Sequence, residues 1–167
     1  MHREGHIGAA LLAYAPVGFV ALALGFQGIA VLGAIGAGAL AMVPDYDQNI
    51  PGIRHRGITH TVWFAGLVGL VLGVAGVAIG FGQNDLLAAM GLGMFGTVVG
   101  SGTILSHIAA DSLTPMGVEP YAPIRDDHYT YGVARASNTL ANYGLLILGG
   151  VAIVVALAAG SALSGVF

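Results

Sequence analysis

The chain has 167 residues, of which 56% are hydrophobic and 8% are charged, and its formal net charge is -3. Soluble domains carry about 25% charged residues, so this composition excludes an ordinary soluble domain and predicts one membrane-embedded domain over residues 1–167. The absence of Cys excludes disulfides and thiolate metal ligands, and no Lys/Arg cluster is present that could bind nucleic acid.

Apolar stretches cover residues 7–25, 28–43, 61–82, 86–107 and 143–163. Most are close to the roughly 20 residues that a membrane-spanning helix needs. We therefore expect an all-α fold, an integral membrane bundle of about five transmembrane helices with a polar site at one end. Because the first stretch contains Pro16 and the second is short, this hairpin is predicted to kink, tilt or stop short of the far surface.

The first stretch has a competing interpretation as a secretory signal peptide, because Ala21-Leu22-Ala23 resembles a small-residue cleavage site. Residues 1–6, however, contain one Arg and one Glu instead of a positive excess, and a second apolar stretch follows almost at once. We therefore favour a helical hairpin.

Glycines are frequent inside the apolar stretches, where small residues allow membrane helices to approach closely. The clearest pairs, each four residues apart, are Gly69 with Gly73, Gly76 with Gly80, and Gly96 with Gly100. We interpret them first as packing faces within one protomer, and a homo-oligomer formed through Gly-rich helix faces stays open as an alternative.

Polar residues are unevenly distributed if alternate connections of the bundle lie on opposite sides of the membrane. All six His, all five Arg and every acidic residue except Asp85 then fall on one side. By the positive-inside rule this side is cytoplasmic, so we expect a multi-pass cell-membrane protein whose amino terminus and polar site face the cytoplasm.

Four separated clusters on this side contain the chemically versatile residues, namely His6; Asp45 and Asp47; His55 and His60; and His107 and Asp111. The last pair is four residues apart, so both side chains share a face if the helix continues. Pro44 favours an extended segment after it, which would turn Asp45 and Asp47 the same way. We place His55 in a loop and His60 in the first turn of a helix, with Thr59 as its N-cap.

Imidazole and carboxylate ligands without thiolate suit a divalent metal, most favourably Zn²⁺, with Mn²⁺ and Fe²⁺ as alternatives. The clusters offer more ligands than one tetrahedral ion takes, so one to three ions are expected, and such clusters catalyse phosphoester displacement. Arg54 and Arg56 are candidates to hold a phosphate, or they are ordinary positive-inside anchors. Asp45, if it is not a ligand, is the candidate general base.

Other polar positions give weaker signals. The turn Thr114-Pro115-Met116-Gly117 is placed to shape the mouth of the site, and Asn138 and Asn142 are candidate helix caps or hydrogen-bonding supports. Asp126, Asp127 and His128 are assigned to an exposed loop and not to the metal ligands.

The order of an early His, a Pro-Asp-x-Asp motif, HRGITH at residues 55–60 and HIAADSLTPMGV at residues 107–118 resembles the YdjM-like family of predicted membrane-bound metal-dependent hydrolases. The resemblance covers residues 2–124, and its two longest motifs are the most specific. It implies a metal-dependent hydrolase with metal ligands at the matching positions, His6, Asp45, Asp47, His55, His60, His107 and Asp111.

The predicted function is therefore membrane-bound, metal-dependent hydrolysis, with Asp45 and Arg56 as catalytic residues. A phosphoester of a lipid or other amphiphile is the preferred substrate, because a site at the membrane surface is readily reached from the bilayer. Two alternatives stay open, a structural or stress-response membrane protein that binds metal without catalysis, and a metal or proton transporter. A transporter would need polar residues on both sides or near the midplane, and the far side has only Asp85.

Overall fold

The computed structural model describes residues 1–165 and is helical. Its elements are α1 (Arg3–Ala23), α2 (Gln27–Leu40), the short 3₁₀ helices η1 (Pro44–Asn49) and η2 (Ile58–His60), α3 (Val62–Gly82), α4 (Leu86–Ser112) and α5 (Thr139–Ser164). Within residues 1–165, five segments are long and apolar enough to cross a membrane, with α2 counted together with η1. The prediction of an all-α bundle of about five spans is therefore confirmed.

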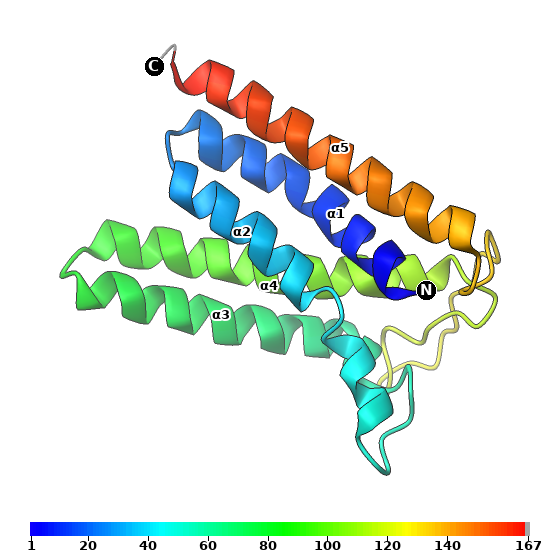
Figure 1. Cartoon of the computed structure of the whole chain (residues 1–167). Coiled ribbons are helices and arrows are strands. Elements are labelled where there is room, and N and C mark those ends of the chain that lie inside the picture. Colours follow the sequence, from blue (N-terminus) through cyan, green and yellow to red (C-terminus); the bar gives the residue numbers. More distant parts are fainter. Residues whose placement is uncertain (166–167) are drawn as a thin grey trace.

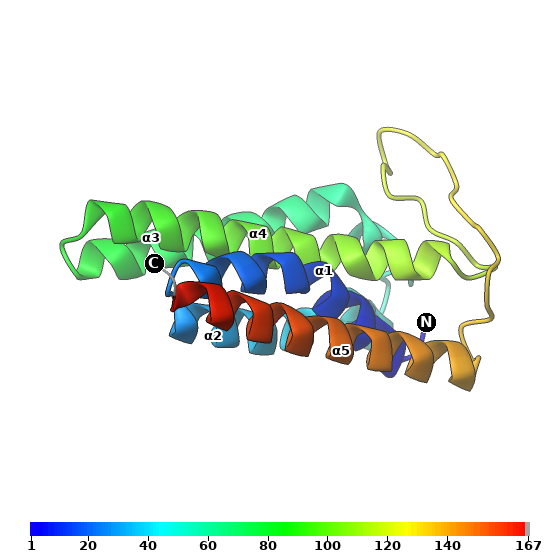
Figure 2. The same cartoon turned by 90° about the horizontal axis from the view of Figure 1, so that it is seen from above.

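The helices form two groups that run side by side (Figures 1 and 2). The antiparallel hairpin of α3 and α4 makes one group. The other group consists of α1, α2 and α5, in which α1 packs against both α5 and α2. The turns between α1 and α2 and between α3 and α4 lie at one end, here named the turn end. The amino terminus, η1 and the long connection over residues 113–138 lie at the opposite end, here named the polar end.

Several helix limits differ from the predicted apolar stretches. The polar first turn of α1 begins at Arg3, and α5 begins at Thr139 because the Asn138 side chain caps it by accepting a hydrogen bond from the Ala141 amide at 3.0 Å. α4 continues to Ser112, which keeps His107 and Asp111 within one helix as expected. α2 ends at Leu40, so the prediction of a short second helix is confirmed.

Two local predictions are wrong. The segment after Val43 is 3₁₀-helical and not extended, because Pro44 has the backbone conformation of a first helical residue and the amides that follow bond back over three residues. The cap of α3 is Thr61, whose hydroxyl accepts a hydrogen bond from the Phe64 amide, and not Thr59. His60 consequently precedes α3 and lies in η2.

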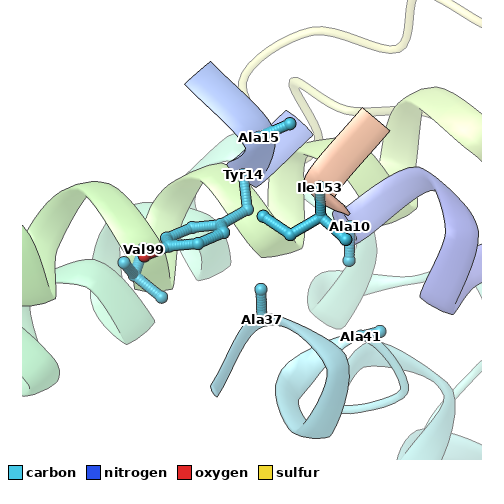
Figure 3. Close-up of a cluster of buried hydrophobic side chains, with 7 residues drawn as sticks. All are labelled: Ala10, Tyr14, Ala15, Ala37, Ala41, Val99 and Ile153. Carbon is cyan, nitrogen blue, oxygen red and sulfur yellow. The ribbon is translucent and has the colours of Figure 1, made fainter. Parts of the chain in front are cut away.

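Close helix contacts depend on glycine, as predicted. The six glycines of the three predicted pairs all lie where α3 meets α4. A methyl group at Gly73, Gly76, Gly80 or Gly96 would collide with the opposite helix, and one at Gly69 or Gly100 would approach it to 3.0 Å. α1 and α5 meet in the same way through Gly8 and Gly149. Between the two groups, Ala10, Tyr14, Ala37, Val99 and Ile153 fill the core with small and branched side chains (Figure 3).

Candidate metal centre

Five segments bring the predicted ligands together at the polar end. The first turn of α1 supplies His6, η1 supplies the two aspartates, the loop before η2 supplies His55, η2 supplies His60, and the last turns of α4 supply His107 and Asp111. The side chains of His6, His60 and His107 are fully buried. A buried group of this polarity is costly unless its members satisfy one another or bind an ion.

Four ligand atoms form a compact group, contributed by Asp45, His60, His107 and Asp111. The two Nε2 atoms of His60 and His107 are 3.2 Å apart, and the carboxylate oxygens lie 3.4–3.7 Å from them. Tetrahedral coordination with bonds of about 2.0–2.1 Å places neighbouring ligands roughly 3.3–3.4 Å apart. The spacing of this group therefore fits a single tetrahedral ion.

The two central imidazoles are each fixed through Nδ1. In His107, Nδ1 lies 2.7 Å from the Ala41 carbonyl oxygen, which can only accept a hydrogen bond, so this nitrogen donates. In His60, Nδ1 lies 3.0 Å from the Thr59 hydroxyl, which in turn donates to Asp47 at 2.8 Å. Both rings thus direct Nε2 into the four-ligand group, the arrangement in which outer hydrogen bonds orient metal-binding histidines.

His6 lies beside this group. Its ring stacks on that of His107 with centroids 3.6 Å apart and an interplanar angle of 8°. Its Nε2 atom is 3.5 Å from Asp111 Oδ1 and 3.8 Å from Asp45 Oδ2, the oxygens of each carboxylate that do not belong to the four-ligand group. Each carboxylate therefore presents one oxygen to His6 and its other oxygen to His60 and His107.

Asp47, His55 and His60 form a second possible metal-binding group. Asp47 is already well supplied with donors, because its Oδ2 accepts hydrogen bonds from the Thr59 hydroxyl at 2.8 Å and the Arg56 amide at 3.2 Å. Its Oδ1 lies 3.0 Å from His55 Nδ1. His55 keeps 35% of its side chain exposed, so this group faces the outside of the cluster.

Arg56 is buried, with 8% of its side chain exposed, and its guanidinium bonds to the protein itself. It donates to Asp111 Oδ1 at 2.7 Å, to the Thr114 hydroxyl at 3.0 Å and to the Gly117 carbonyl at 2.9 Å. The amino group of Met1 contacts the same Asp111 oxygen. These bonds leave Asp111 Oδ2 to face the histidines, so Arg56 holds this carboxylate in place and neutralises it.

The backbone at Arg56 adopts φ 59°, a left-handed conformation that costs a non-glycine residue energy and is found preferentially at functional sites. Gly57 follows it, and a methyl group there would approach the Arg54 carbonyl oxygen to 2.7 Å. The bend turns both the amide and the side chain of Arg56 into the cluster, while Arg54 points away. The side chain of Arg54 is 80% exposed, and its Nη2 atom lies 3.9 Å from Glu119 Oε1.

The structure also shows the positions of the remaining polar residues that the sequence singled out. Thr114 is fully buried, and its hydroxyl accepts a hydrogen bond from Arg56. Asn142, which is also buried, accepts a hydrogen bond from the His2 amide and so ties α5 to the start of α1. Asp126 and His128 are exposed in the long connection. Thr59 lies within HRGITH and links His60 to Asp47, a supporting role that the motif does not predict. The Ala41 and Gly117 carbonyls, which accept hydrogen bonds from His107 and Arg56, are backbone groups, so no residue type in the sequence predicts their roles.

His60 lies outside the spanning helices, and its protonation is coupled to the cluster. Burial lowers the pKa of His60, but the Asp111 and Asp45 carboxylates, whose oxygens lie 3.4–3.5 Å from its Nε2 atom, outweigh burial and raise the pKa above its ordinary value. A proton is thus favoured at the same nitrogen that faces the four-ligand group, and a bound cation would replace it.

The cluster meets the chemical requirements of a metal site. Both ring nitrogens of His6 and the Oδ2 atom of Asp111 are buried without a hydrogen-bond partner in the described structure. Such atoms are rare because losing water without replacement costs about 1–3 kcal/mol each. Imidazole nitrogens and carboxylate oxygens are ligands of divalent metals, so these buried His and Asp groups can hold a metal ion.

The chain was compared with curated proteins, solved structures and models of protein families. No curated protein and no solved structure matches the chain. The sequence model described as YdjM inner membrane protein matches residues 1–166, nearly the whole chain. With five apolar spanning helices, this match identifies a multi-pass membrane protein. The chain therefore belongs to the YdjM inner membrane protein family.

Proposed function

We propose that the protein is a metal-dependent hydrolase of the membrane surface that cleaves a phosphoester of a lipid or another amphiphile. One observation carries this proposal: the cluster supplies more buried ligands than one ion takes, including the His6 nitrogens that have no partner in the described structure. A metal with a purely structural role needs four ligands and no surplus.

Zn²⁺ is the metal that best suits this set, because three imidazoles face the cluster and no thiolate is present. His60, His107 and Asp111 would hold the ion, and His6, whose Nε2 atom lies 3.5 Å from Asp111 Oδ1, would be a further ligand. When bound, the metal polarises a phosphoryl oxygen and lowers the pKa of water to about 7.

Asp45 is the best candidate for general base. It keeps 10% of its side chain exposed, whereas Asp47 and Asp111 are buried, so water reaches the cluster at Asp45. In the proposed reaction the attacking water gives a proton to this carboxylate as its oxygen bonds to phosphorus. The bond to the leaving alkoxide breaks, and the alkoxide takes up that proton from Asp45 to depart as the alcohol. Asp47 holds His60 through Thr59, and Arg56 holds Asp111. The Nε–H group of Arg56, which is buried without a partner in the described structure, would be a donor for a phosphate.

The substrate class follows from the surroundings of the cluster. Large apolar side chains are exposed around it, among them Ile58, Met116 and Ile124 with 65–72% exposure. Apolar side chains beside polar groups suit the zone where lipid headgroups meet hydrocarbon. A substrate with a phosphate headgroup and an apolar tail would reach this site without leaving the bilayer.

The test is turnover by purified protein in mixed micelles with bis(p-nitrophenyl) phosphate and with phosphatidic acid, alongside metal analysis. We expect chelation to abolish turnover and Zn²⁺ to restore it. Asp45→Asn should keep the metal and lose about 10²- to 10⁴-fold in kcat. His107→Ala should lose metal and turnover, and His128→Ala, in the exposed loop, should lose neither. Metal-loaded wild-type protein without turnover would overturn the proposal.

A structural metal site is the second candidate, and a specific observation favours it. Asp45, His60, His107 and Asp111 by themselves have the number and spacing of a closed tetrahedral site. In that case Asp45 is a ligand, so Asp45→Asn would release the metal and lower stability in parallel. Retention of metal by Asp45→Asn with loss of turnover would instead support the hydrolase.

We further propose that the polar end faces the cytoplasm. All five Arg residues lie in its segments, and Arg and Lys remain preferentially on the cytoplasmic side during insertion. Because the chain has no Cys, single-cysteine variants report orientation directly. In intact cells a membrane-impermeant maleimide should label Ser161→Cys, near the turn end, and spare Ser137→Cys. The reverse pattern would refute this orientation.

A further inference from the structure

A large groove lies at the turn end, far from the metal centre. Its volume is about 900 Å³, near the upper limit of ligand pockets, which run to about 1,000 Å³. α4 forms one wall with Leu87, Gly91 and Met94, and α1 forms the other with residues such as Val20. Figure 1 shows α1 and α2 diverging from α4 toward this end.

The groove has the polarity of an amphiphile. Its walls are apolar, and Leu87, Met94 and Val20 are 52–81% exposed, which is unfavourable in water but suits hydrocarbon. Its polar residues, Gln83 and Asp85, lie at the outer edge, in and beside the turn between α3 and α4. Polar groups at the membrane surface with an apolar channel below match the order of headgroup and acyl chain in a lipid.

The length of the groove also suits one leaflet. Along α4 it extends from Leu87 to Val98, which at about 1.5 Å per residue is roughly 16 Å. Half of a hydrocarbon core of about 30 Å is nearly the same distance. At its inner end Phe95 packs edge-on against Tyr14, whose hydroxyl donates a hydrogen bond to the Ala30 carbonyl, and Tyr14 belongs to the core cluster (Figure 3).

The charge of Asp85 at the edge of the groove should favour some lipid headgroups over others. Asp85 is the single charged residue of the α3–α4 turn and the five Arg residues all lie in segments of the polar end. One carboxylate oxygen of Asp85 accepts the Ala88 amide at 3.0 Å, and the residue is exposed. An anionic headgroup would be repelled there, whereas an ammonium group would be attracted.

We propose that this groove binds one phospholipid of the leaflet opposite the metal centre, with an acyl chain between α1 and α4 and an amine-bearing headgroup, as in phosphatidylethanolamine, beside Asp85. The site is separate from the metal centre, and its occupant need not be hydrolysed. Lipid bound here would fill the space that separates the hairpin of α1 and α2 from α4.

The proposal is tested by native mass spectrometry of protein extracted from vesicles of equimolar phosphatidylethanolamine and phosphatidylglycerol. Wild-type protein should retain one phosphatidylethanolamine per chain. Gly91→Phe fills the groove from α4 and should reduce retention at least tenfold. Gly66→Phe is the matched control, because both glycines have open space where a side chain would begin, but Gly66 lies on α3 outside the groove.

Val20→Phe fills the same space from α1 and gives the answer if Gly91→Phe does not fold. Asp85→Asn keeps the helix cap, since Asn caps as well as Asp, and should remove the preference for phosphatidylethanolamine without reducing total lipid. Equal retention in wild type and both filling variants would overturn the proposal, as would a wild-type chain without lipid. A wild-type dimer that Gly91→Phe separates would show a second copy of the chain in the groove instead.

Discussion

The Nε2 atoms of His60 and His107 face each other at 3.2 Å although the residues lie 47 positions apart. Each ring has its Nδ1 held by a different group, the Thr59 hydroxyl for one and the Ala41 carbonyl for the other. Two nitrogen lone pairs at this distance repel, so a proton must lie on one of them or a cation must bind both. The stability of the fold and its affinity for metal should therefore both depend on pH.

Removal of metal should destabilise the protein. A ligand that binds only the folded state stabilises it by about 2.7 kcal/mol at a concentration of 100 Kd. We expect a chelator to lower the Tm of the protein in detergent, and stoichiometric Zn²⁺ to restore it. Wild type and His128→Ala should respond alike, and His107→Ala should not respond. A chelator-insensitive wild-type Tm after verified metal removal would contradict a metal-stabilised cluster.

Arg56→Met should weaken the metal centre and the fold together. The substitution leaves the buried Asp111 carboxylate without its guanidinium partner, and breaking a buried ion pair by removing one member costs about 3–5 kcal/mol. Arg54→Met is the matched control, because Arg54 is 80% exposed and surface changes usually stay within about 0.5 kcal/mol. Chemical unfolding of the two variants measures the difference, and similar losses would show that Arg56 is not a structural partner of Asp111.

Thr59→Val should lower metal affinity while the protein stays folded. The hydroxyl links His60 Nδ1 to Asp47, and loss of such an outer contact typically reduces metal affinity by about 10- to 100-fold. Thr59→Ser keeps the hydroxyl and should bind metal like wild type. Competition with a coloured chelator measures both affinities, and a Thr59→Val protein with undiminished affinity would refute the role of this link.

Gly149→Ala should destabilise the pairing of α1 and α5, whereas Gly150→Ala should not. A methyl group at Gly149 would collide with the backbone of Gly8, but the neighbouring Gly150 has open space. Overpacking typically costs about 1–3 kcal/mol. The Tm values of the two variants in one detergent provide the comparison, and equal values would show that the helices can separate at no cost.

Metal-free and metal-bound protein should respond to pH in opposite directions. Because the pKa of His60 is raised in the folded state, its protonation stabilises the metal-free fold fully below the unfolded-state pKa of about 6.5, and this contribution is lost as pH rises through the folded-state pKa. A metal must displace that proton, so metal affinity should fall as pH decreases through the raised pKa. Chelator competition and thermal unfolding across pH 5–9 test both trends. Metal affinity and metal-free stability that change in the same direction with pH would contradict a shared role of the His60 proton.

The spans and the distribution of polar residues could be predicted from the sequence because lipid imposes a simple rule on it. A helix that crosses hydrocarbon must be apolar for about 20 residues, and that requirement is visible in the chain without tertiary information. The pairing of His107 with Asp111 was predictable for a similar reason, since helical periodicity alone places them on one face. The glycine faces of α3 and α4 also follow from local spacing.

The arrangement of the metal centre was less predictable. The sequence predicts an extended segment after Pro44, yet η1 is helical. The φ of proline is compatible with both conformations, so the neighbouring residues decide which one forms. Arg54 and Arg56 have the same charge and neighbouring positions, but only one is turned inward by a strained backbone. Thr59 and the Ala41 carbonyl act on His60 and His107 through contacts that no sequence pattern encodes.

By itself, therefore, the sequence determined which residues lie in lipid, which end of the bundle is polar and which residue types are available as ligands, because hydropathy and helical period act locally. Only the tertiary structure decided which ring nitrogen faces the cluster, which arginine supports Asp111 and where a groove opens between α1 and α4. Those outcomes depend on the packing of segments far apart in the chain, where differences of about an ångström determine whether two groups bond, collide or leave space.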